Sequence, residues 1–497
     1  MEEKKNSKAK RGIKSILFLI IIVVILISYY INSIKKKNVF YFINKLKKSI
    51  NTKQKQSIRP KDNSFCDNLD PISMFNIRLK NGPKTICKTE TSSHVCYNDF
   101  NSTYNTMFYY MKNGVICKME NVVLDPSKSS KTNITYKGPV DKMNLGLPIL
   151  SNGFLNMKCD KKNDYNGYNG FYGPYFNSWN YNFTNKEEYE ELAPGKTIFF
   201  LSRNQDSPNL FHGGSELINA ISIMHLFNLK PEDIQIIFLE SIEIKDDPFY
   251  DLYKNLVSRG GEPIYIKNLK QKYHISSGFH IPLNWDSPCM IKNDYQNCKY
   301  PTYTYKLLNT LVNKYLNVTD FKDNFTTDNE IYYYPKSVID SYKSNITFNK
   351  SITLQWRQAW PKGRKDQSRL LGNGPQLADK LASVLPKNFL IRLVNTGGMS
   401  ISEQISIMKK TDYLVGIHGA GLCLSVYLPD ESIMHEVLHL PNMRVLVVMS
   451  SLSGHKTYSD YVRYKTKYDD NDNENIMFQP DIFARKVLTH MIENDYF

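Results

Sequence analysis

The residues with the clearest chemical potential follow a short apolar run, Tyr413–Ile417. The tetrapeptide His418–Gly421 (HGAG) comes directly after that run, and the apolar stretch 422–428 follows it. This pattern predicts a buried strand, a glycine-rich turn and the start of a helix. Glycines let backbone N–H groups approach a ligand closely, and a helix N-terminus favours phosphate oxygens. The turn is therefore a candidate phosphate-binding site, and a plain packing turn is the alternative.

An acidic residue follows the turn at an informative spacing. Residues 433–438 are apolar apart from His435 and Glu436 and predict the next buried strand. Glu436 comes 20 residues after Gly416, the spacing at which an acidic residue of a nucleotide-binding βαβ unit meets a ribose hydroxyl. We expect Glu436 to hold a ribose or otherwise contact a nucleotide; a salt bridge is the alternative.

Two αβ blocks must position these residues. In the first block, strands are predicted at 197–201 and 234–239, with a helix between them whose apolar residues recur on one face from Leu217 to Met224. The second block begins at Ser351, with strands at 352–354 and 389–394 and helices at 376–384 and 400–410. Two such blocks in series predict an α/β protein with two facing Rossmann-like domains and a ligand cleft between them.

Composition bounds the class of protein. The chain has 497 residues, is 41% hydrophobic and carries a net charge of +16. Residues 1–65 hold 16 Lys+Arg against 3 Asp+Glu, whereas the remainder holds 48 against 45. Because the basic excess belongs to the N-terminal part and the rest is nearly neutral, nucleic-acid binding is disfavoured.

The N-terminal part has the pattern of a membrane signal anchor. Residues 16–31 contain no charged residue, and lysines flank them on both sides. No small-residue cleavage site follows, so an uncleaved anchor is favoured over a cleaved signal peptide. We expect a cytosolic tail at 1–15, the anchor at 16–31 and a polar, Lys-rich stem at 32–65.

Sequons and cysteines indicate where the rest of the chain resides. Seven N-x-Ser/Thr sequons follow the anchor, at Asn101, Asn133, Asn182, Asn317, Asn324, Asn345 and Asn349. Cys87 and Cys96 are nine residues apart, as are Cys289 and Cys298, which makes both pairs candidates for short disulfide loops. Seven of the eight cysteines lie outside the HGAG region, and no C-x-x-C pair exists to favour zinc. Together these features predict a single-pass type II membrane protein of the endoplasmic reticulum or Golgi, with its bulk in the oxidising lumen.

The predicted domains follow from these boundaries. Residues 66–345 form a lumenal N-terminal region, irregular, β-rich and disulfide-tied at first, with the first Rossmann-like domain at about 195–345. Residues 317–349 are polar and read as an exposed connection. Residues 346–497 form the second Rossmann-like domain, predicted to bind a nucleotide-linked ligand.

Several motifs together resemble glycosyltransferase family 61, which includes the EGF-domain O-linked N-acetylglucosamine transferase, the protein O-mannose N-acetylglucosaminyltransferase and plant β-1,2-xylosyltransferases. The most specific is Ser402–Gln404 followed by residues 411–422 (TDYLVGIHGAGL), with Leu428-Pro429 and Glu436 after it. Further matches are Arg357 with the Arg-x-x-x-Asn element 369–373, and the Asn-x-x-His-x-x-x-Glu element 209–216. The resemblance spans about residues 200–440.

Membership implies a GT-B architecture, an inverting mechanism and a nucleotide-sugar donor. The resemblance therefore predicts transfer of a sugar, GlcNAc or xylose, from a UDP-sugar to a glycoprotein or glycan acceptor. No Asp-x-Asp is flanked by apolar residues, so no cofactor is expected to be required and a divalent metal is not expected to be essential.

Inverting transfer needs a base, a positively polarised site for the departing diphosphate and a fixed donor. The base candidates are Glu216 and His212, four residues apart on one helix face; for Glu216 the alternative is charge compensation at the helix N-terminus. The candidates for donor binding are Arg357, Arg369, Asn373, His418, Gly419, Ala420, Gly421 and Glu436. For each arginine the alternative is a solvated surface charge, and for His418 it is a buried histidine that satisfies backbone carbonyls.

Two other functions remain open at this point. One is an inactive relative that binds nucleotide or glycan; intact Arg369, His418 and Glu436 favour the enzyme over it. The other is a dinucleotide oxidoreductase, which the sequence disfavours because the turn lacks the third glycine of G-x-G-x-x-G.

Overall fold

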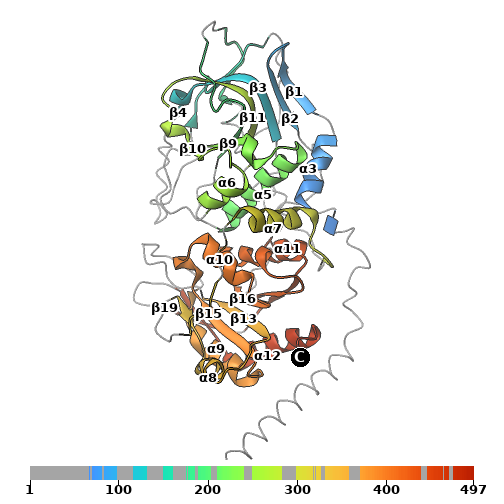
Figure 1. The fold of residues 1–497 in the computed structure, drawn as a ribbon, viewed down its shortest axis with the longest axis vertical. Helices are drawn as coiled ribbons and strands as arrows, with labels where there is room; N and C mark the ends of the chain where they lie inside the picture. The colour runs from blue at the N-terminus through green and yellow to red at the C-terminus, as the bar shows by residue number, and fades with distance from the viewer. Residues whose placement is uncertain are drawn as a thin grey trace, which may run out of the picture. The chain divides into compact units, whose positions relative to one another are not determined.

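A computed structural model describes a large part of the chain. The described residues are 66–67, 70–80, 83–97, 116–130, 149–159, 175, 177–184, 188–202, 210–239, 249–282, 298–316, 318, 321–325, 331–356, 370–437, 445–462, 464–468 and 474–497. The chain divides into two compact units, residues 59–479 and a second unit of residues 1–58 with 480–497. In the second unit the described element is helix α12 (Pro480–Glu493). The larger unit holds the remaining elements (Figure 1).

The predicted mixed α/β class is confirmed, and the first sheet of the larger unit has a parallel centre. Its strand order is β1-β2-β3-β11-β8-β9-β10. The strands β11, β8, β9 and β10 run parallel, whereas β3 pairs antiparallel with β11 and with β2. The bounds are β1 Pro83–Lys88, β2 Ser93–Tyr97, β3 Ile116–Leu124, β8 Thr197–Leu201, β9 Ile234–Phe238, β10 Ile264–Tyr265 and β11 Tyr273–His280. In addition, β6 (Leu155–Asn156) pairs with β3, and β7 (Trp179–Asn180) pairs with β6.

The second sheet is parallel except at one edge. Its order is β12-β15-β13-β16-β17-β18, and only β12 pairs antiparallel. The bounds are β12 Tyr332–Tyr333, β13 Lys350–Gln355, β15 Phe389–Val394, β16 Tyr413–Ile417, β17 Ile433–Val437 and β18 Lys456–Asp460. Two small sheets complete the described strands: β14 (Leu370–Leu371) with β20 (Glu474–Phe478) and β19 (Tyr464–Tyr468), and β4 (Ser129–Ser130) with β5 (Ile149–Leu150).

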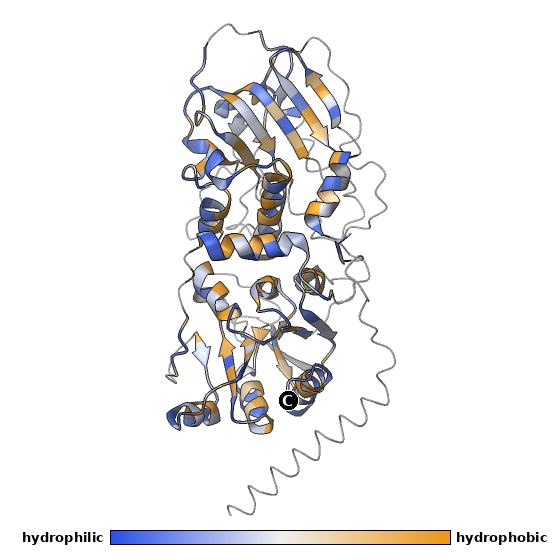
Figure 2. Cartoon of the chain, turned by 45° about the vertical axis from the view of Figure 1, so that its right-hand side comes forward, coloured by the Kyte–Doolittle hydropathy of each residue, from blue (hydrophilic) through white to orange (hydrophobic). Residues whose placement is uncertain are grey.

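Helices form where apolar residues recur with the helical period or where a capping residue begins the helix. The apolar face from Leu217 to Met224 lies inside α5, and the predicted capping box of Ser400 and Glu403 opens α10. Buried hydrophobic residues lie in the central strands and along the helices beside them, and the colouring of Figure 2 marks such residues along strands and helices. The helix bounds are α3 Pro71–Lys80, α5 Leu210–Leu226, α6 Tyr250–Leu256, α7 Tyr303–Tyr315, α8 Lys336–Lys343, α9 Gly374–Val384, α10 Ile401–Met408 and α11 Val445–Leu452.

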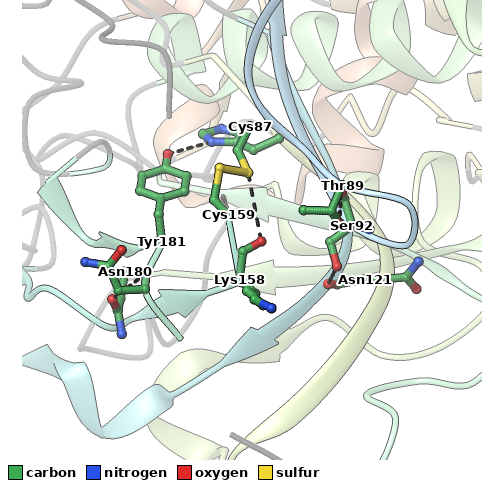
Figure 3. The surroundings of a disulfide bond; sticks show 10 residues. Cys87, Thr89, Ser92, Asn121, Lys158, Cys159, Asn180 and Tyr181 are labelled. Carbon is green, nitrogen blue, oxygen red and sulfur yellow. Dashed lines mark hydrogen bonds between the residues drawn. A yellow bond between two sulfur atoms is a disulfide. The ribbon is translucent and has the colours of Figure 1, made fainter. Parts of the chain in front are cut away.

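The disulfides correct both predicted short loops. The bonds are Cys66–Cys298, Cys87–Cys159 and Cys96–Cys117. Cys87 therefore does not pair with Cys96, because Cys96 lies opposite Cys117 on the neighbouring strand. Cys298 bonds to a cysteine 232 residues earlier, and Cys289 lies outside the described residues. Figure 3 shows Cys87–Cys159 beside Lys158 and Tyr181, where it fastens the start of the sheet to the segment after β6.

The N-terminal region continues the first sheet instead of preceding it as a separate irregular layer. Strands β1, β2 and β3 extend the sheet beyond β11 (Figure 1). Thus the parallel strands predicted from about residue 195 are only the centre of a wider sheet.

The polar segment 317–349 is not simply an exposed connection, which corrects that prediction. It contains β12 and α8, and β12 joins the second sheet, so that sheet begins before the predicted boundary at 346. Arg392, completely buried in β15, donates to both carboxylate oxygens of Asp323 at 3.1 and 3.0 Å. Its Nε also donates to Thr353 Oγ1 at 2.9 Å. This ion pair, made by Nη1 of Arg392, therefore attaches the segment around Asp323 to the second sheet.

No helix within the described ranges has both the length and the apolar character that a membrane span needs. The predicted tail, anchor and stem, residues 1–65, lie outside those ranges.

Candidate functional site

The order of the second sheet identifies the place where a ligand can bind. Counted along the chain, its parallel strands lie in the order second, first, third, fourth, fifth, because β15 and β16 flank β13 on opposite sides. The connection that follows β13 and the connection that follows β16 therefore run in opposite directions along the sheet. In open α/β sheets, ligands bind at the carboxyl ends of the strands where the order reverses. At this point the carboxyl ends of β13 and β16 carry Gln355 and Ile417, and His418 follows directly.

The predicted glycine-rich turn lies at this edge and is its accessible part. Gly419, Ala420 and Gly421 are partly exposed, whereas Tyr413–His418 and residues 422–428 are buried. The turn leads into a 3-10 helix, η8 (Ala420–Tyr427), and not into the α-helix that the sequence suggested. The three residues at the start of this helical segment are thus partly accessible, and backbone amides at such a position suit an anion.

Position 421 has no room for a side chain, whether or not a ligand binds to the turn. A Cβ atom at this position would lie 2.1 Å from Gln355 Nε2, so the side chain of Gln355 fills the space that glycine leaves. Gln355 Nε2 in turn donates to Thr396 Oγ1 at 3.2 Å. Gln355 therefore supports the turn from β13, and Thr396 supports Gln355 from the 3-10 helix η7 (Thr396–Gly398), which follows β15.

His418 is held by a chain of polar side chains that crosses three strands. Its Nδ1 is hydrogen-bonded to Glu436 Oε1, and Glu436 Oε2 accepts from Ser459 Oγ at 2.9 Å. Glu436 is 0% exposed and lies directly opposite Gly416 and Ser459 in the sheet register. Both of its carboxylate oxygens are thus engaged within the protein, which is the pairing expected as the alternative, and the ribose contact stays a prediction.

The predicted base residues lie on an element that contacts the turn. Helix α5 carries His212 and Glu216 and packs against η8. Phe211 and Leu217 belong to the same hydrophobic cluster as Leu422 of η8. Helix α7 contacts η8 as well, since Asn309 Nδ2 donates to Val426 O at 3.1 Å. The first sheet's helices therefore meet the second sheet's turn.

His212 and Glu216 differ in accessibility. His212 is partly exposed, whereas Glu216 is 2% exposed within α5. Gly213 between them is buried against Phe249, because a Cβ atom there would lie 2.5 Å from the Phe249 ring. Close packing of α5 on this ring fixes the helix that presents His212.

Comparison with protein families decides the class of this site. Residues 265–435 match the family model described as Glycosyltransferase 61. The chain thus carries a segment that matches glycosyltransferase family 61. The match runs from β10 to β17 and includes Gln355 and the whole turn 418–421. The domain supports glycosyltransferase activity, as the motifs indicated. A search of curated proteins found no match to the chain.

Not every residue predicted to bind the glycosyltransferase's donor reaches this edge. Both oxygen and nitrogen of the Asn373 side chain bind the backbone of Phe478, at 3.1 and 2.8 Å. Asn373 thus joins the start of α9 to β20, a structural role, and its predicted donor contact stays a prediction. Arg357 and Arg369 lie outside the described residues.

Three polar residues at the site were missed by the sequence reasoning: Gln355, Thr396 and Ser459. The positions of Gln355 and Thr396 could have been found from the sequence. Gln355 ends the strand run of β13, and Thr396 comes two residues after β15, so both are expected at the carboxyl edge of the sheet. Ser459 lies in a strand of mixed polarity, Lys456–Asp460, and its partner Glu436 is set by register. No spacing rule connects those two residues.

One cluster of potential metal ligands in the described part of the chain is already used. The ligand atoms of His94, Cys96 and Cys117 lie within 4.8 Å of one another. Because Cys96 and Cys117 form a disulfide, their sulfurs are not thiolate ligands in this state.

The structure also describes four of the seven predicted glycosylation sites. Asn182, Asn324, Asn345 and Asn349 are exposed. For Asn349, however, the sequon hydroxyl belongs to Ser351, which is buried at the start of β13 and donates to Lys410 O at 2.5 Å. Asn101, Asn133 and Asn317 lie outside the described residues.

Proposed function

We propose that this glycosyltransferase is an inverting enzyme of GT-B architecture that transfers GlcNAc or xylose from a UDP-sugar to a glycoprotein or glycan. The single observation that carries the proposal is the exposed turn Gly419–Gly421 at the point where the order of the parallel sheet reverses. The turn provides backbone amides for a diphosphate, and His418 adds a polar side chain beside them.

In the proposed reaction the acceptor hydroxyl attacks the anomeric carbon of the sugar from the side opposite the diphosphate. A carbon–oxygen bond forms to the acceptor while the bond from the anomeric carbon to the phosphate oxygen breaks. The departing nucleoside diphosphate takes the electron pair, and the hydroxyl proton passes to a base on the protein. Amides of Gly419–Gly421 and His418 stabilise the negative charge that develops on the leaving group.

His212 is the proposed base, and Glu216 is its supporting residue. Only His212 of the two is partly exposed, and a base must reach the acceptor proton within hydrogen-bond distance. Glu216 lies four residues after His212, on the same face of α5, and is buried. It is therefore proposed to support His212 from within the protein instead of contacting the acceptor. Arg357 and Arg369 are proposed to pair the diphosphate oxygens, on the motif resemblance alone.

The setting of the enzyme is proposed from the sequence. A type II anchor at 16–31 would place the catalytic part in the lumen of the endoplasmic reticulum or Golgi. Three disulfides and exposed sequon asparagines fit an oxidising, glycosylating compartment.

Donor turnover tests the proposal. The full chain, purified in detergent, is assayed for hydrolysis and transfer against a panel of UDP-sugars, with and without EDTA. We expect turnover of one donor, unaffected by EDTA, lost in Arg369→Ala and His418→Ala and retained in a matched control, Lys387→Ala, at an exposed position between α9 and β15. UDP binding without turnover of any donor would instead favour an inactive nucleotide-binding relative. Loss of turnover in EDTA would overturn metal independence.

A further inference from the structure

Three aromatic rings form an accessible surface at the C-terminal end of α8. Tyr342, near the end of this helix, is 52% exposed. Phe325 stacks on it with ring centroids 4.1 Å apart, so one face of the Tyr342 ring is covered and the exposed fraction belongs to the rest of the ring. Phe325 also stacks with Phe348, at 6.1 Å. We call Phe325, Tyr342 and Phe348 the aromatic surface.

The way in which α8 ends fixes a sequon asparagine beside this surface. Asn345 has a φ of 53°, the left-handed conformation that asparagine tolerates better than most residues. Its N–H donates to Tyr342 O at 2.9 Å, and the N–H of Ile346 donates to Ser341 O at 3.0 Å. These two bonds make the Schellman pattern that closes a helix. The backbone of Asn345 is thus held within one helical turn of Tyr342.

The sequon at this position is accessible at both of its functional residues. Asn345 is exposed, and so is Thr347, which supplies the sequon hydroxyl. The sequon that follows differs, because its hydroxyl belongs to the buried Ser351. Asn324, next to Phe325, is exposed as well, but the hydroxyl residue of its sequon lies outside the described residues. The structure therefore favours Asn345 as the attachment point of a sugar at the aromatic surface.

A sugar linked to Asn345 has a suitable partner in the ring of Tyr342. A pyranose carries C–H groups on its faces and hydroxyls around its edge. Its C–H groups, which are slightly positive, favour the negative face of an aromatic ring, and the contact removes apolar area of both from water. Positions three apart on a helix surface are about 5–6 Å apart, which is within the reach of one sugar ring.

We propose that Asn345 carries an N-linked glycan whose first sugar packs on Tyr342 and covers the aromatic surface. The inference rests on the lumenal setting of the proposed function, because the lumen supplies the lipid-linked oligosaccharide diphosphate that is the sugar donor. In the transfer, the amide nitrogen of Asn345 loses a proton and bonds to the anomeric carbon of the first sugar. The bond from that carbon to the diphosphate breaks, and the lipid diphosphate leaves with the electron pair. This chain is the acceptor in that reaction, which the compartment's own transferase performs.

The packed sugar also supports the segment that precedes β12. Phe325 comes two residues after Asp323, whose carboxylate pairs with Arg392 and accepts from Tyr334 Oη at 2.8 Å. A sugar on Tyr342 extends the ring stack that holds Phe325 in place. It also covers aromatic area that would otherwise favour association with other proteins.

Site-resolved mass spectrometry tests whether Asn345 is glycosylated. The full chain is produced in the secretory pathway of a eukaryotic host, and its glycans are removed enzymatically in heavy-oxygen water, which labels each formerly glycosylated asparagine. Trypsin releases residues 344–350, which contain Asn345 and Asn349, and fragmentation separates the two positions. We expect the label at Asn345. Glycans at other asparagines but not at Asn345 would overturn this inference alone, whereas a chain without any glycan would overturn the lumenal setting as well.

The rate at which the glycan is released from the folded chain tests packing on Tyr342. Tyr342→Ala removes the ring, whereas Tyr342→Phe keeps it. Asn182 is the matched control, because its sequon is exposed but Trp179, three residues before it, is buried in the core. We expect release from Asn345 to be about fivefold faster in Tyr342→Ala and within about twofold of the natural rate in Tyr342→Phe, with no change at Asn182. An equal rate at Asn345 in Tyr342→Ala and in the natural chain would overturn the packing.

Thermal unfolding gives a second, independent readout. Thr347→Val removes the sequon hydroxyl and leaves Asn345 in place. We expect it to lower Tm by about 2 °C in the natural background and to have no effect in Tyr342→Ala, because the ring that the sugar packs on is then missing. Equal shifts in both backgrounds would contradict the proposed contact. An aromatic surface that carries no glycan and holds two copies of the chain together until Tyr342 is replaced would assign it to self-association instead and overturn the inference.

Discussion

Histidines of the two large sheets lie in opposite chemical surroundings. In the second sheet, His418 is bound to the carboxylate of Glu436 beside a partly exposed turn. In the first sheet, His94 stacks on Trp179 with ring centroids 3.9 Å apart, and His280 stacks on Tyr175 at 4.0 Å. Burial lowers the pKa of both His94 and His280 to about 3.

This difference shows how the surrounding residues decide whether a histidine packs in the core or serves at a candidate site. His94 and His280 are neutral aromatic core residues, because desolvation disfavours the charged ring. His418 has an anionic partner on one side and accessible backbone amides next to it in the chain. A histidine supported by a carboxylate at the reversal point of a parallel sheet is a functional candidate, whereas one stacked among rings is a packing residue.

The largest effect on activity is expected from replacing His418, the histidine of this comparison that lies at the candidate site. His418→Gln keeps an N–H donor for Glu436 but removes the imidazole, so we expect kcat to fall about 100-fold or more. His94→Gln should leave kcat of the folded protein within about threefold and lower stability instead, because it disrupts the stack on Trp179. Steady-state kinetics and thermal unfolding of both variants measure this contrast. Equal kinetic losses in the two variants would contradict it.

An intermediate effect sharpens the account of the turn. Gly421→Ala forces Gln355 away from the position it occupies, so we expect about a 10-fold loss in kcat/KM. Removing the obstructing side chain in Gly421→Ala/Gln355→Ala should restore part of that loss. Kinetics of the two single variants and the double variant form a cycle that isolates the contact. Strict additivity would show that Gln355 and Gly421 do not act together.

The smallest expected effect concerns acid stability of the first sheet. Because the pKa of His94 is about 3 in the folded chain and about 6.5 when unfolded, the unfolded state binds more protons between these values. Stability contributed by neutral His94 is therefore full above pH 6.5 and is lost as pH falls toward 3. His94→Phe keeps a stacking ring without a proton site and should unfold in urea with a shallower pH dependence. If the stability of His94→Phe depended on pH as strongly as that of the natural chain, His94 would not be a source of the loss of stability in acid.

Local signals predicted the elements that form the site. The apolar runs 197–201, 389–394 and 413–417 coincide with β8, β15 and β16, because strands buried on both faces read as continuous apolar sequence. The capping box at Ser400 likewise marked the start of α10. Local sequence therefore sufficed for the strand and turn that carry His418.

Non-local pairing could not be predicted from these signals. Cys66 bonds to a partner 232 residues away, and spacing gave Cys298 a nearer one. Ser459 meets Glu436 only because β17 and β18 pair in one register. Strand β12 is two tyrosines within a polar segment, and it forms by pairing with β15 and not by its own periodicity.

The most direct test of the central claim is hydrogen exchange of the full chain with and without UDP, read by mass spectrometry. The account predicts protection of peptides covering 413–428, where the amides of Gly419–Gly421 bind the diphosphate, and little change in peptides covering β11 and its histidine, Tyr273–His280. Measurable UDP binding that protects the β11 peptides and leaves 413–428 unchanged would contradict the claim that the second sheet's turn is the donor site.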